Sequence, residues 1–506
     1  MLKTESYKKG VIYSTGLNII AKGVQFLNTL TIAFFFGTST NTDVYFFVIS
    51  ISILITTGMI NGIDTIILIP YAMKLRELEG EISSRIFLNF FIFLYILIGL
   101  AISLCVIFSP TLFYSAFSKF PSGMLEQNRY LLYAGSLLIF FQLVNNFLGS
   151  LLSSYKYFTI TILTNFITSL FSIFVTIFFH NQLGVAGTLA AVVTSYGINF
   201  LFLIVVMKLR LKWQFGKVTF MRSRELWGNI GLMQLNILPV WLKNYVTLFL
   251  LTGLGEGVVS SVNLAQQASS IIDTLIVTQV LSVASIKFNE LYAKGDFPSL
   301  NEIFIKVANY LLLLIIPVVV VTFFYADYIA VLVFKRGTMG KSSLDTIALC
   351  LKYMILLAPF TLLNSICTRI FSSTHVIRRS LLYSMTAHII FLILTIVFIN
   401  WLQLKGYLYS LLAGYSVLIF LFYLIFRFNL KQITFTKVLK YWIIQLVINL
   451  AIACPVFLTL RNFTGLNAII LLFTAAFIQV MVIGIINRKQ FSLSRMTNLL
   501  YGAKNK

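Results

Sequence analysis

Residues 86–108 read IFLNFFIFLYILIGLAISLCVIF, a run of 23 residues without one charged side chain. A helix of that length rises about 35 Å, enough to cross the hydrocarbon core of a bilayer, which is about 30 Å thick. Thirteen comparable runs predict an all-α polytopic membrane protein with about 14 transmembrane helices. The runs lie near 11–36, 44–70, 86–108, 130–152, 157–179, 185–207, 226–254, 262–286, 307–325, 344–371, 381–400, 406–427, 442–460 and 466–486.

The composition of all 506 residues agrees with a membrane protein. Hydrophobic residues make up 59% and charged residues only 10%, whereas an ordinary soluble domain is about one quarter charged. The four cysteines and three histidines show no spacing typical of disulfides or metal ligands, so we expect no metal and no cofactor. Loops of at most about 25 residues leave no room for a soluble catalytic or nucleotide-binding domain. We therefore expect a transporter that is not an enzyme.

The basic residues predict the orientation of the chain. Loops on one side of the expected membrane carry 27 Lys and Arg, loops on the other side carry 7, and four lie inside the runs. Basic loops stay in the cytoplasm, so this imbalance places both termini there. The net charge of +23 is then explained by orientation and contact with anionic membrane lipids, and no nucleic-acid partner is expected.

An internal repeat is indicated by five residue identities that all keep one constant spacing along the chain. They pair Phe141, Leu143, Asn145, Ser153 and Ser154 with Phe360, Leu362, Asn364, Ser372 and Ser373. Six expected helices separate the copies, so the two halves would be parallel repeats. The predicted organisation is a bundle of helices 1–6 at 1–222, a bundle of helices 7–12 at 223–436, and helices 13–14 with a basic cytoplasmic tail at 437–506.

Ionisable residues inside the runs mark a candidate binding site, because each costs at least about 2.5 kcal/mol in the bilayer centre. Lys22 and Asp64 lie in the first two expected helices, and Lys243 and Asp273 lie in helices 7 and 8. One interpretation is that each Lys neutralises an Asp between neighbouring helices. The other is that these charges face a central aqueous cavity and bind a charged headgroup.

Amides accompany these charges. Helix 1 offers Gln25 and Asn28, and helix 8 offers Gln267. Amide side chains suit the hydroxyls of a sugar, but in membranes they also join helices by hydrogen bonds. Both interpretations stay open at this stage.

Three short segments, which begin at Phe36, Leu332 and Thr368, resemble motifs of the MviN/MurJ family of flippases for lipid-linked peptidoglycan precursors. Phe36-Gly37-x5-Asp43-x-Tyr45-Phe46 resembles the family's FG-x5-DA-(F/Y) signature. Leu332-Val-Phe334-Lys335-Arg336-Gly337 and Thr368-Arg369-Ile370-Phe371 resemble its LF-x-RG and TR-x-F(Y/F) segments. The resemblance implies a fold like that of MurJ and the related MATE exporters. It also implies two bundles that alternate access around a central cavity, and a groove at helices 13 and 14 for a lipid tail. Gly37, Asp43, Arg336, Gly337 and Arg369 would be structural motif residues.

The chain departs from this family in its cavity charge. Where the family members closest to the peptidoglycan function carry arginines, this sequence has Lys22, Asn28, Thr56 and Gln267, so only one of four cations remains. Helix 7 also lacks the acid that a sodium site of the family type would use. These differences make a lipid-linked glycan other than the peptidoglycan precursor plausible.

The sequence therefore predicts a flippase for an undecaprenyl-pyrophosphate-linked sugar in the bacterial cytoplasmic membrane. Candidate substrate-binding residues are Lys22, Gln25, Asn28, Asp64, Lys243, Gln267 and Asp273. The alternatives are a Wzx-type flippase for O-antigen or capsule units, a MATE-like cation-coupled exporter in which Asp64 or Asp273 titrates, and an integral-membrane glycosyltransferase. No nucleotide is expected, because Gly337–Ser342 lacks the first glycine of a phosphate loop, where Lys335 stands.

Overall fold

The computed structural model describes residues 7–60, 62–220, 223–273, 277–374, 377–461 and 468–487, and no strand occurs in these ranges. The apolar runs expected from the sequence are helical over nearly all of their described residues. The predicted basic tail lies almost entirely in residues 488–506, outside the described residues. Contacts group the chain into two compact units, Met1–Ser260 and Ser261–Lys506.

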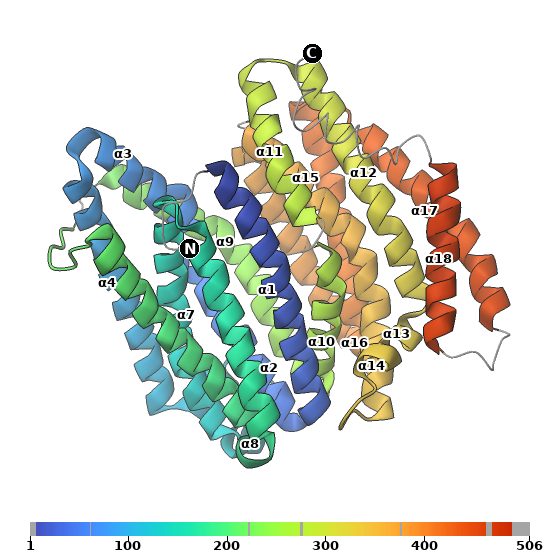
Figure 1. Cartoon of the computed structure of the whole chain (residues 1–506), viewed down its shortest axis with the longest axis horizontal. Helices are drawn as coiled ribbons and strands as arrows, with labels where there is room; N and C mark the ends of the chain where they lie inside the picture. The colour runs from blue at the N-terminus through green and yellow to red at the C-terminus, as the bar shows by residue number, and fades with distance from the viewer. Residues whose placement is uncertain are drawn as a thin grey trace. The chain divides into compact units, whose positions relative to one another are not determined.

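The first unit is built mainly of long apolar helices (Figure 1). Its core lies where α3, α4, α7 and α8 pack, with Phe91, Leu143 and Phe147 among its buried side chains. Its elements are α1 (Tyr7–Phe36), α2 (Thr40–Ile60), a π-helical segment η1 (Ile63–Leu68), α3 (Ile69–Glu79), α4 (Glu81–Phe108), α5 (Pro110–Ser115), α6 (Ser122–Gln127), α7 (Arg129–Ser154), α8 (Phe158–Leu211) and α9 (Arg224–Leu251).

The second unit is also helical over most of its described residues. Helix α10 (Val258–Ile272) begins at the end of the first unit and continues into the second. The other elements are α11 (Thr278–Ala293), α12 (Phe297–Phe324), α13 (Ala326–Phe334), α14 (Lys341–Met354), the short 3-10 helix η3 (Ile355–Leu357), α15 (Ala358–Ser373), α16 (Ile377–Asn429), α17 (Phe435–Arg461) and α18 (Ala468–Ile486).

Helices α8 and α16 are each broken once and fold back on themselves. In α8 the break is at Gly184, whose φ of 56° favours glycine. Thr176 and Thr188, on opposite sides of this break, bring their hydroxyl oxygens within 2.9 Å. In α16 the break is at Gln403, with φ 52°, and Thr395 donates to Ser410 at 3.4 Å. Each of the two helices is therefore a pair of antiparallel helices, as the sequence predicted.

The internal repeat is confirmed by the breaks in these two helices. Helices α8 and α16 break at Gly184 and Gln403. This pair of positions keeps the spacing of the five identities found in the sequence. Gly187 and Gly406 keep it too. A Cβ atom would overlap the Leu183 side chain next to the break at the first position, and the Phe398 backbone of the facing segment at the second. The spacing seen in five residues thus extends through the break of each hairpin.

Some features were not predicted. Hydropathy did not indicate η1, which interrupts the second long helix, or the short helices α5, α6 and α13. Within the described residues, nine helical stretches are long and apolar enough to cross a membrane, and the two broken helices are among them. The count of 14 crossings stays a prediction. The bundle boundaries at residues 222 and 436 also stay predictions. Helix α9, which the prediction assigns to the second bundle, packs against α2 of the first, and these contacts do not tell which helices move together.

Helices α17 and α18 are joined by a ladder of buried amides. The Gln445 amide donates to Asn487 at 3.1 Å, and the Gln479 amide donates to the backbone and side-chain oxygens of Asn449 at 3.1 and 3.0 Å. All four side chains are buried. In a bilayer, such bonds hold helices together where apolar surface gives no preference for a partner.

Candidate functional site

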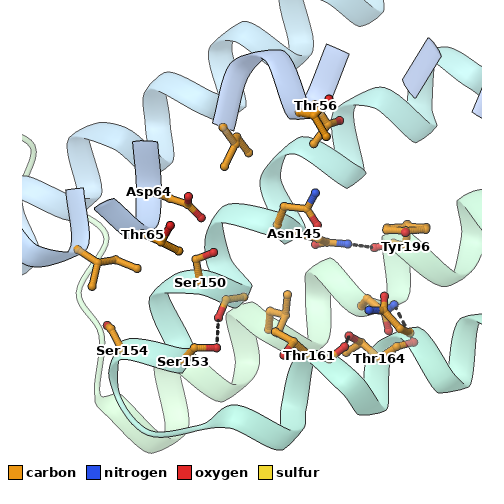
Figure 2. Close-up of a pocket in the computed structure, with 18 of the residues that line it drawn as sticks. Thr56, Asp64, Thr65, Asn145, Ser150, Ser153, Ser154, Thr161, Thr164 and Tyr196 are labelled. Atoms are coloured by element: carbon orange, nitrogen blue, oxygen red, sulfur yellow. Dashed lines mark hydrogen bonds between the residues drawn. The ribbon is translucent and has the colours of Figure 1, made fainter. Parts of the chain in front are cut away.

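A polar cavity lies inside the first unit, between α2, η1, α7 and the two halves of α8 (Figure 2). Its volume of about 620 Å³ is within the range typical of small-ligand sites, about 300–1,000 Å³. Hydroxyl and amide side chains line most of it: Thr56, Thr57, Thr65, Asn145, Asn146, Ser150, Ser153, Ser154, Thr161, Thr164, Asn165 and Asn199. The cavity is therefore suited to neutral polar groups or to a cation.

Asp64 is the charged side chain among the described residues that line this cavity. It lies in η1, which begins after Gly62, a glycine with φ 80°. The π-helical turn shifts the register of the second long helix, a local irregularity that is frequent at functional sites. The Asp64 side chain is directed toward the Ser150 hydroxyl of α7 (Figure 2), and only 5% of the residue is exposed.

Two amides hold the walls of the cavity in place. Asn145 of α7 donates to the Tyr196 carbonyl of α8 at 2.8 Å, and Asn199 donates to the Thr168 hydroxyl at 3.0 Å across the α8 hairpin. The Oδ1 atom of Asn145 and the hydroxyl of Thr56 are both buried without a hydrogen-bond partner among the described residues. Both oxygen atoms are also closed to a water-sized sphere, so neither faces the open space of the cavity.

The predicted charges on the first two helices do not neutralise each other. Lys22 is exposed on α1 and donates to Gln25 at 2.9 Å, so these two candidates lie together. No Lys or Arg among the described residues forms an ion pair with Asp64. The Oδ1 atom of Asn28 is buried and has no hydrogen-bond partner in the described ranges. In this unit, mutual neutralisation does not explain the buried acid.

The remaining candidates lie on other helices. Lys243 is half-buried in α9, and its carbonyl accepts a hydrogen bond from Thr247 at 2.7 Å. In the second unit, Gln267 and Asp273 are half-buried on the second long helix of the repeat. Asp273 lies in a π-helical turn, as Asp64 does, and its carboxylate lies near Thr361 of α15. The two units thus place an acid in similar local backbone.

The motif residue Asp43 ties the α1–α2 corner to the start of α10. Its buried carboxylate accepts hydrogen bonds from the backbone N–H of Gly257 at 2.6 Å and from the N–H and hydroxyl of Ser260, both at 2.7 Å. Nearby, the N–H of Thr40 donates to Glu256 at 2.9 Å, and its hydroxyl donates to the same carboxylate oxygen. A carboxylate at the first turn of a helix satisfies N–H groups that have no partner within that helix.

The other motif residues lie at helix ends or on exposed faces. Gly37 ends α1 with φ 60°, and Gly337 follows α13 with φ 68°, so both positions favour glycine. Arg336 and Arg369 are exposed, and neither lines the cavity of the first unit.

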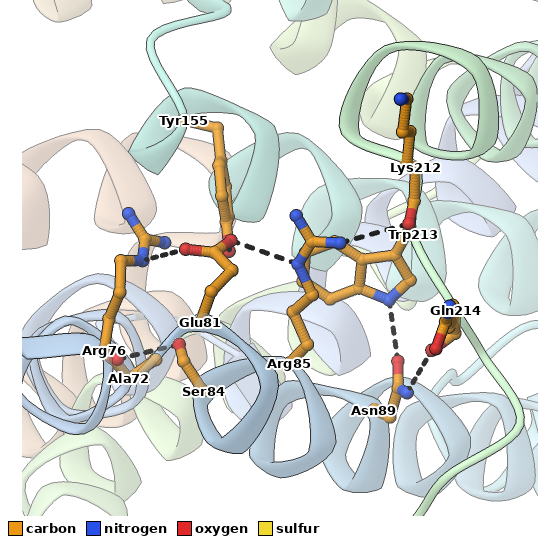
Figure 3. A network of polar contacts seen from close by, with 10 residues as sticks. All are labelled: Ala72, Arg76, Glu81, Ser84, Arg85, Asn89, Tyr155, Lys212, Trp213 and Gln214. Carbon is orange, nitrogen blue, oxygen red and sulfur yellow. Dashed lines mark hydrogen bonds and ion pairs between the residues drawn. The ribbon is translucent and has the colours of Figure 1, made fainter. Parts of the chain in front are cut away.

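At the end of the first unit that carries many of its basic residues, a polar network fixes the loop after α8 (Figure 3). Glu81 at the start of α4 pairs with Arg76 at 3.1 Å and with Arg85 at 3.0 Å, and accepts a hydrogen bond from Tyr155 at 2.9 Å. Asn89 accepts from the Trp213 indole at 2.7 Å and donates to the Gln214 carbonyl at 2.7 Å. These bonds secure the connection between α8 and α9.

The family model described as lipid II flippase MurJ matches residues 32–478. The chain belongs to this family. It is accordingly a multi-pass membrane protein, as the apolar helices predict.

Solved structures with the same fold include MurJ and its relatives. A lipid II flippase MurJ in an inward closed conformation is similar over 94% of this chain and 99% of that one, with a TM-score of 0.74 and 16% identity. An inward-facing multidrug resistance MATE transporter of the MOP superfamily covers 84% of this chain and 94% of its own, with a TM-score of 0.58 and 16% identity. A MOP superfamily transporter from Pyrococcus furiosus covers 83% and 96%, with a TM-score of 0.58 and 18% identity. At such identities these likenesses show the MurJ-like fold alone.

No curated protein matches the sequence. The cavity residues that sequence analysis missed, such as Ser150, Asn165 and Asn199, carry a weak signal in the sequence. They are polar side chains inside apolar runs, and polar groups at membrane depth face the protein interior.

Proposed function

We propose that this protein is a flippase that moves an undecaprenyl-pyrophosphate-linked sugar from the inner to the outer leaflet of the bacterial cytoplasmic membrane. The observation that carries the proposal is membership of the lipid II flippase family over residues 32–478. The protein acts as a transporter and not as an enzyme, and its partners are the lipid-linked sugar and the surrounding lipids. Both termini lie in the cytoplasm, as the distribution of basic residues predicts.

Transport proceeds by alternating access between the two repeated bundles, which takes the headgroup through the membrane while the hydrocarbon tail stays in lipid. Lys22 attracts the pyrophosphate, and Gln25, bonded to Lys22, lies next to it as a contact for the sugar. Lys243, Gln267 and Asp273 serve as further headgroup contacts. A single remaining cation on α1 provides less attraction than several arginines would, which favours a carried glycan different from the peptidoglycan precursor.

Outward movement of one negative charge is favoured by about 2.3 kcal/mol per 100 mV in a cell that is negative inside. The membrane potential therefore contributes to the driving force. In proteoliposomes, collapse of the potential should slow flipping, and an unchanged rate would refute this coupling.

The test of substrate is depletion of the protein in its host, followed by mass spectrometry of lipid-linked intermediates. Accumulation of a pyrophosphate-linked sugar in the inner leaflet is the expected result, and its headgroup identifies the glycan. A repeat unit of capsule or O-antigen would assign the Wzx-type role. Unchanged lipid intermediates together with lost export of an amphipathic cation would refute the flippase and support a MATE-like exporter.

A further inference from the structure

The hydroxyl groups that line the cavity of the first unit serve as hydrogen-bond acceptors. The Thr57 hydroxyl of α2 donates to the Ile53 carbonyl at 2.7 Å. The Ser153 hydroxyl of α7 donates to the Gly149 carbonyl at 2.9 Å (Figure 2). Other lining hydroxyls donate to backbone carbonyls of their own helices in the same way, namely those of Ser154, Thr161 and Thr164. A hydroxyl has one hydrogen to donate, so each of these groups keeps only its oxygen lone pairs for a ligand.

The same cavity also offers donors, which belong to two amides. Asn146 of α7 and Asn165 of α8 line the cavity, and both residues are exposed. No hydrogen bond joins either side-chain amide to another described residue. Each amide presents two N–H donors and one oxygen acceptor. Both lie in apolar helices long enough to span a membrane, where lipid satisfies none of these groups, so they face water or a bound polar ligand.

A ligand that both donates and accepts hydrogen bonds fits this combination of groups. The hydroxyls of a sugar can donate to the hydroxyl oxygens of the cavity and accept from its amide N–H groups. A phosphate or a carboxylate only accepts, and a metal ion uses only acceptors, so each would leave one kind of lining group without a partner. The cavity volume of about 620 Å³ lies in the range of sites for small organic ligands.

The charge of the cavity disfavours an acidic ligand. Asp64 lines the cavity, and no Lys, Arg or His is among its described lining residues. A ligand carboxylate would lose hydration there without a positive group to compensate, and it would lie in the same cavity as the Asp64 carboxylate. Placing like charges together is one way in which a binding site rejects a wrong ligand.

We infer that the cavity between α2, η1, α7 and α8 binds a neutral sugar of the carried headgroup. The Asn146 and Asn165 amides donate to the sugar oxygens, and hydroxyl oxygens of the cavity, such as that of Thr57, accept from the sugar hydroxyls. Asp64 rejects a sugar that bears a carboxylate. The inference rests on the proposed flippase function and narrows its substrate class, since the sugar held in the first unit carries no acidic group.

Three matched probes test the inference on the purified full-length protein by isothermal titration calorimetry. They are the glucose and glucuronic acid conjugates of farnesyl pyrophosphate, and a methyl ester in which a methyl group replaces the sugar. The wild type should bind the glucose probe about tenfold or more tightly than the methyl probe, because several hydrogen bonds are added. The glucuronic acid probe differs from the glucose probe only by a carboxylate at C6, and it should bind about tenfold more weakly than the glucose probe.

Asn165→Leu separates a contact to the sugar from a merely structural role. It should weaken binding of the glucose probe about threefold to tenfold, whereas binding of the methyl probe should not depend on this amide. Asn181→Leu is the matched control, because it removes an exposed amide of the same helix outside the cavity. Asp64→Asn should reduce the preference for glucose over glucuronic acid, since the repelling charge is removed. Asn165→Leu remains informative if Asp64→Asn fails to fold.

Three outcomes would overturn the inference. The first is equal affinity of the wild type for the glucose and methyl probes, and the second is equal affinity for the glucose and glucuronic acid probes. The third is an Asn165→Leu variant that changes all three affinities equally or not at all.

Flipping of the same probes in proteoliposomes separates this inference from the proposed function. Sugar-dependent binding without flipping of any probe would reject the proposed function alone. Flipping together with binding that does not depend on the sugar would reject the sugar site alone. Binding of none of the three probes would reject both.

Discussion

Replacement of Asp43 by Ala should destabilise the corner that joins α1, α2 and α10. The carboxylate is fully buried and accepts three hydrogen bonds at 2.6–2.7 Å. A bond to a charged group is worth about 1.5–3 kcal/mol, and the loss of a buried charged partner typically costs about 3–5 kcal/mol. Because the three bonds share one acceptor group, we expect a total near the latter range, about 3–5 kcal/mol, and not three times the single value.

Thermal unfolding of the purified protein measures this effect. Ser260→Ala is the matched control, since it removes the hydroxyl but keeps both backbone N–H donors, and should cost about 1–2 kcal/mol. In the Asp43→Ala background the same change should cost less, because its partner is already absent. The reasoning is refuted if Asp43→Ala unfolds at the wild-type temperature, or if the two changes are additive.

Three further predictions concern other parts of the chain. Lys22→Gln should reduce the flipping rate in proteoliposomes about tenfold or more, because a charge-assisted contact contributes about 1.5–3 kcal/mol. Lys22→Arg keeps the charge and should keep most of the rate. Equal rates for the two variants would exclude Lys22 from headgroup binding. Asn89→Leu should lower the free energy of unfolding by about 2–3 kcal/mol, since it leaves a buried indole N–H and two backbone carbonyls without their partner. A fall in unfolding temperature no larger than that for substitution of an exposed polar residue would contradict this. Gly406→Ala should lower the free energy of unfolding by about 1–3 kcal/mol and reduce the yield of folded protein, because its Cβ would overlap the Phe398 carbonyl oxygen. Gly484→Ala has open space around it and should be neutral. Similar yields for both variants would mean that the two halves of α16 can move apart without cost.

The helices of this protein were predictable from sequence because each depends on local properties. The run at 86–108 is apolar, long and uninterrupted, and it forms α4 with almost the expected bounds. The constant spacing between the two copies was equally accessible, since equivalent positions keep the same residues where the same packing is required. Gly187 and Gly406 are an example, because each lies at the close approach within a hairpin.

The site was less predictable because its residues meet only after folding. Asp43 was recognised as a motif residue, but its partners Gly257 and Ser260 are far away along the chain and are ordinary loop and helix residues in the sequence. Asp64 was recognised as a buried acid, but no periodicity reveals the π-helical turn that directs it toward Ser150. Hydropathy counts polar residues in an apolar run, but it does not tell which of them share a cavity.

The amide ladder limits where the hydrocarbon tail of a carried lipid can travel. Separating α17 from α18 at the depth of Gln445, Asn449 and Gln479 would expose several amides to oil, at about 0.6–2 kcal/mol for each bond lost. We therefore expect α17 and α18 to move as one rigid pair. An isoprenoid chain would lie against the outer surface of this pair and would not pass between the two helices.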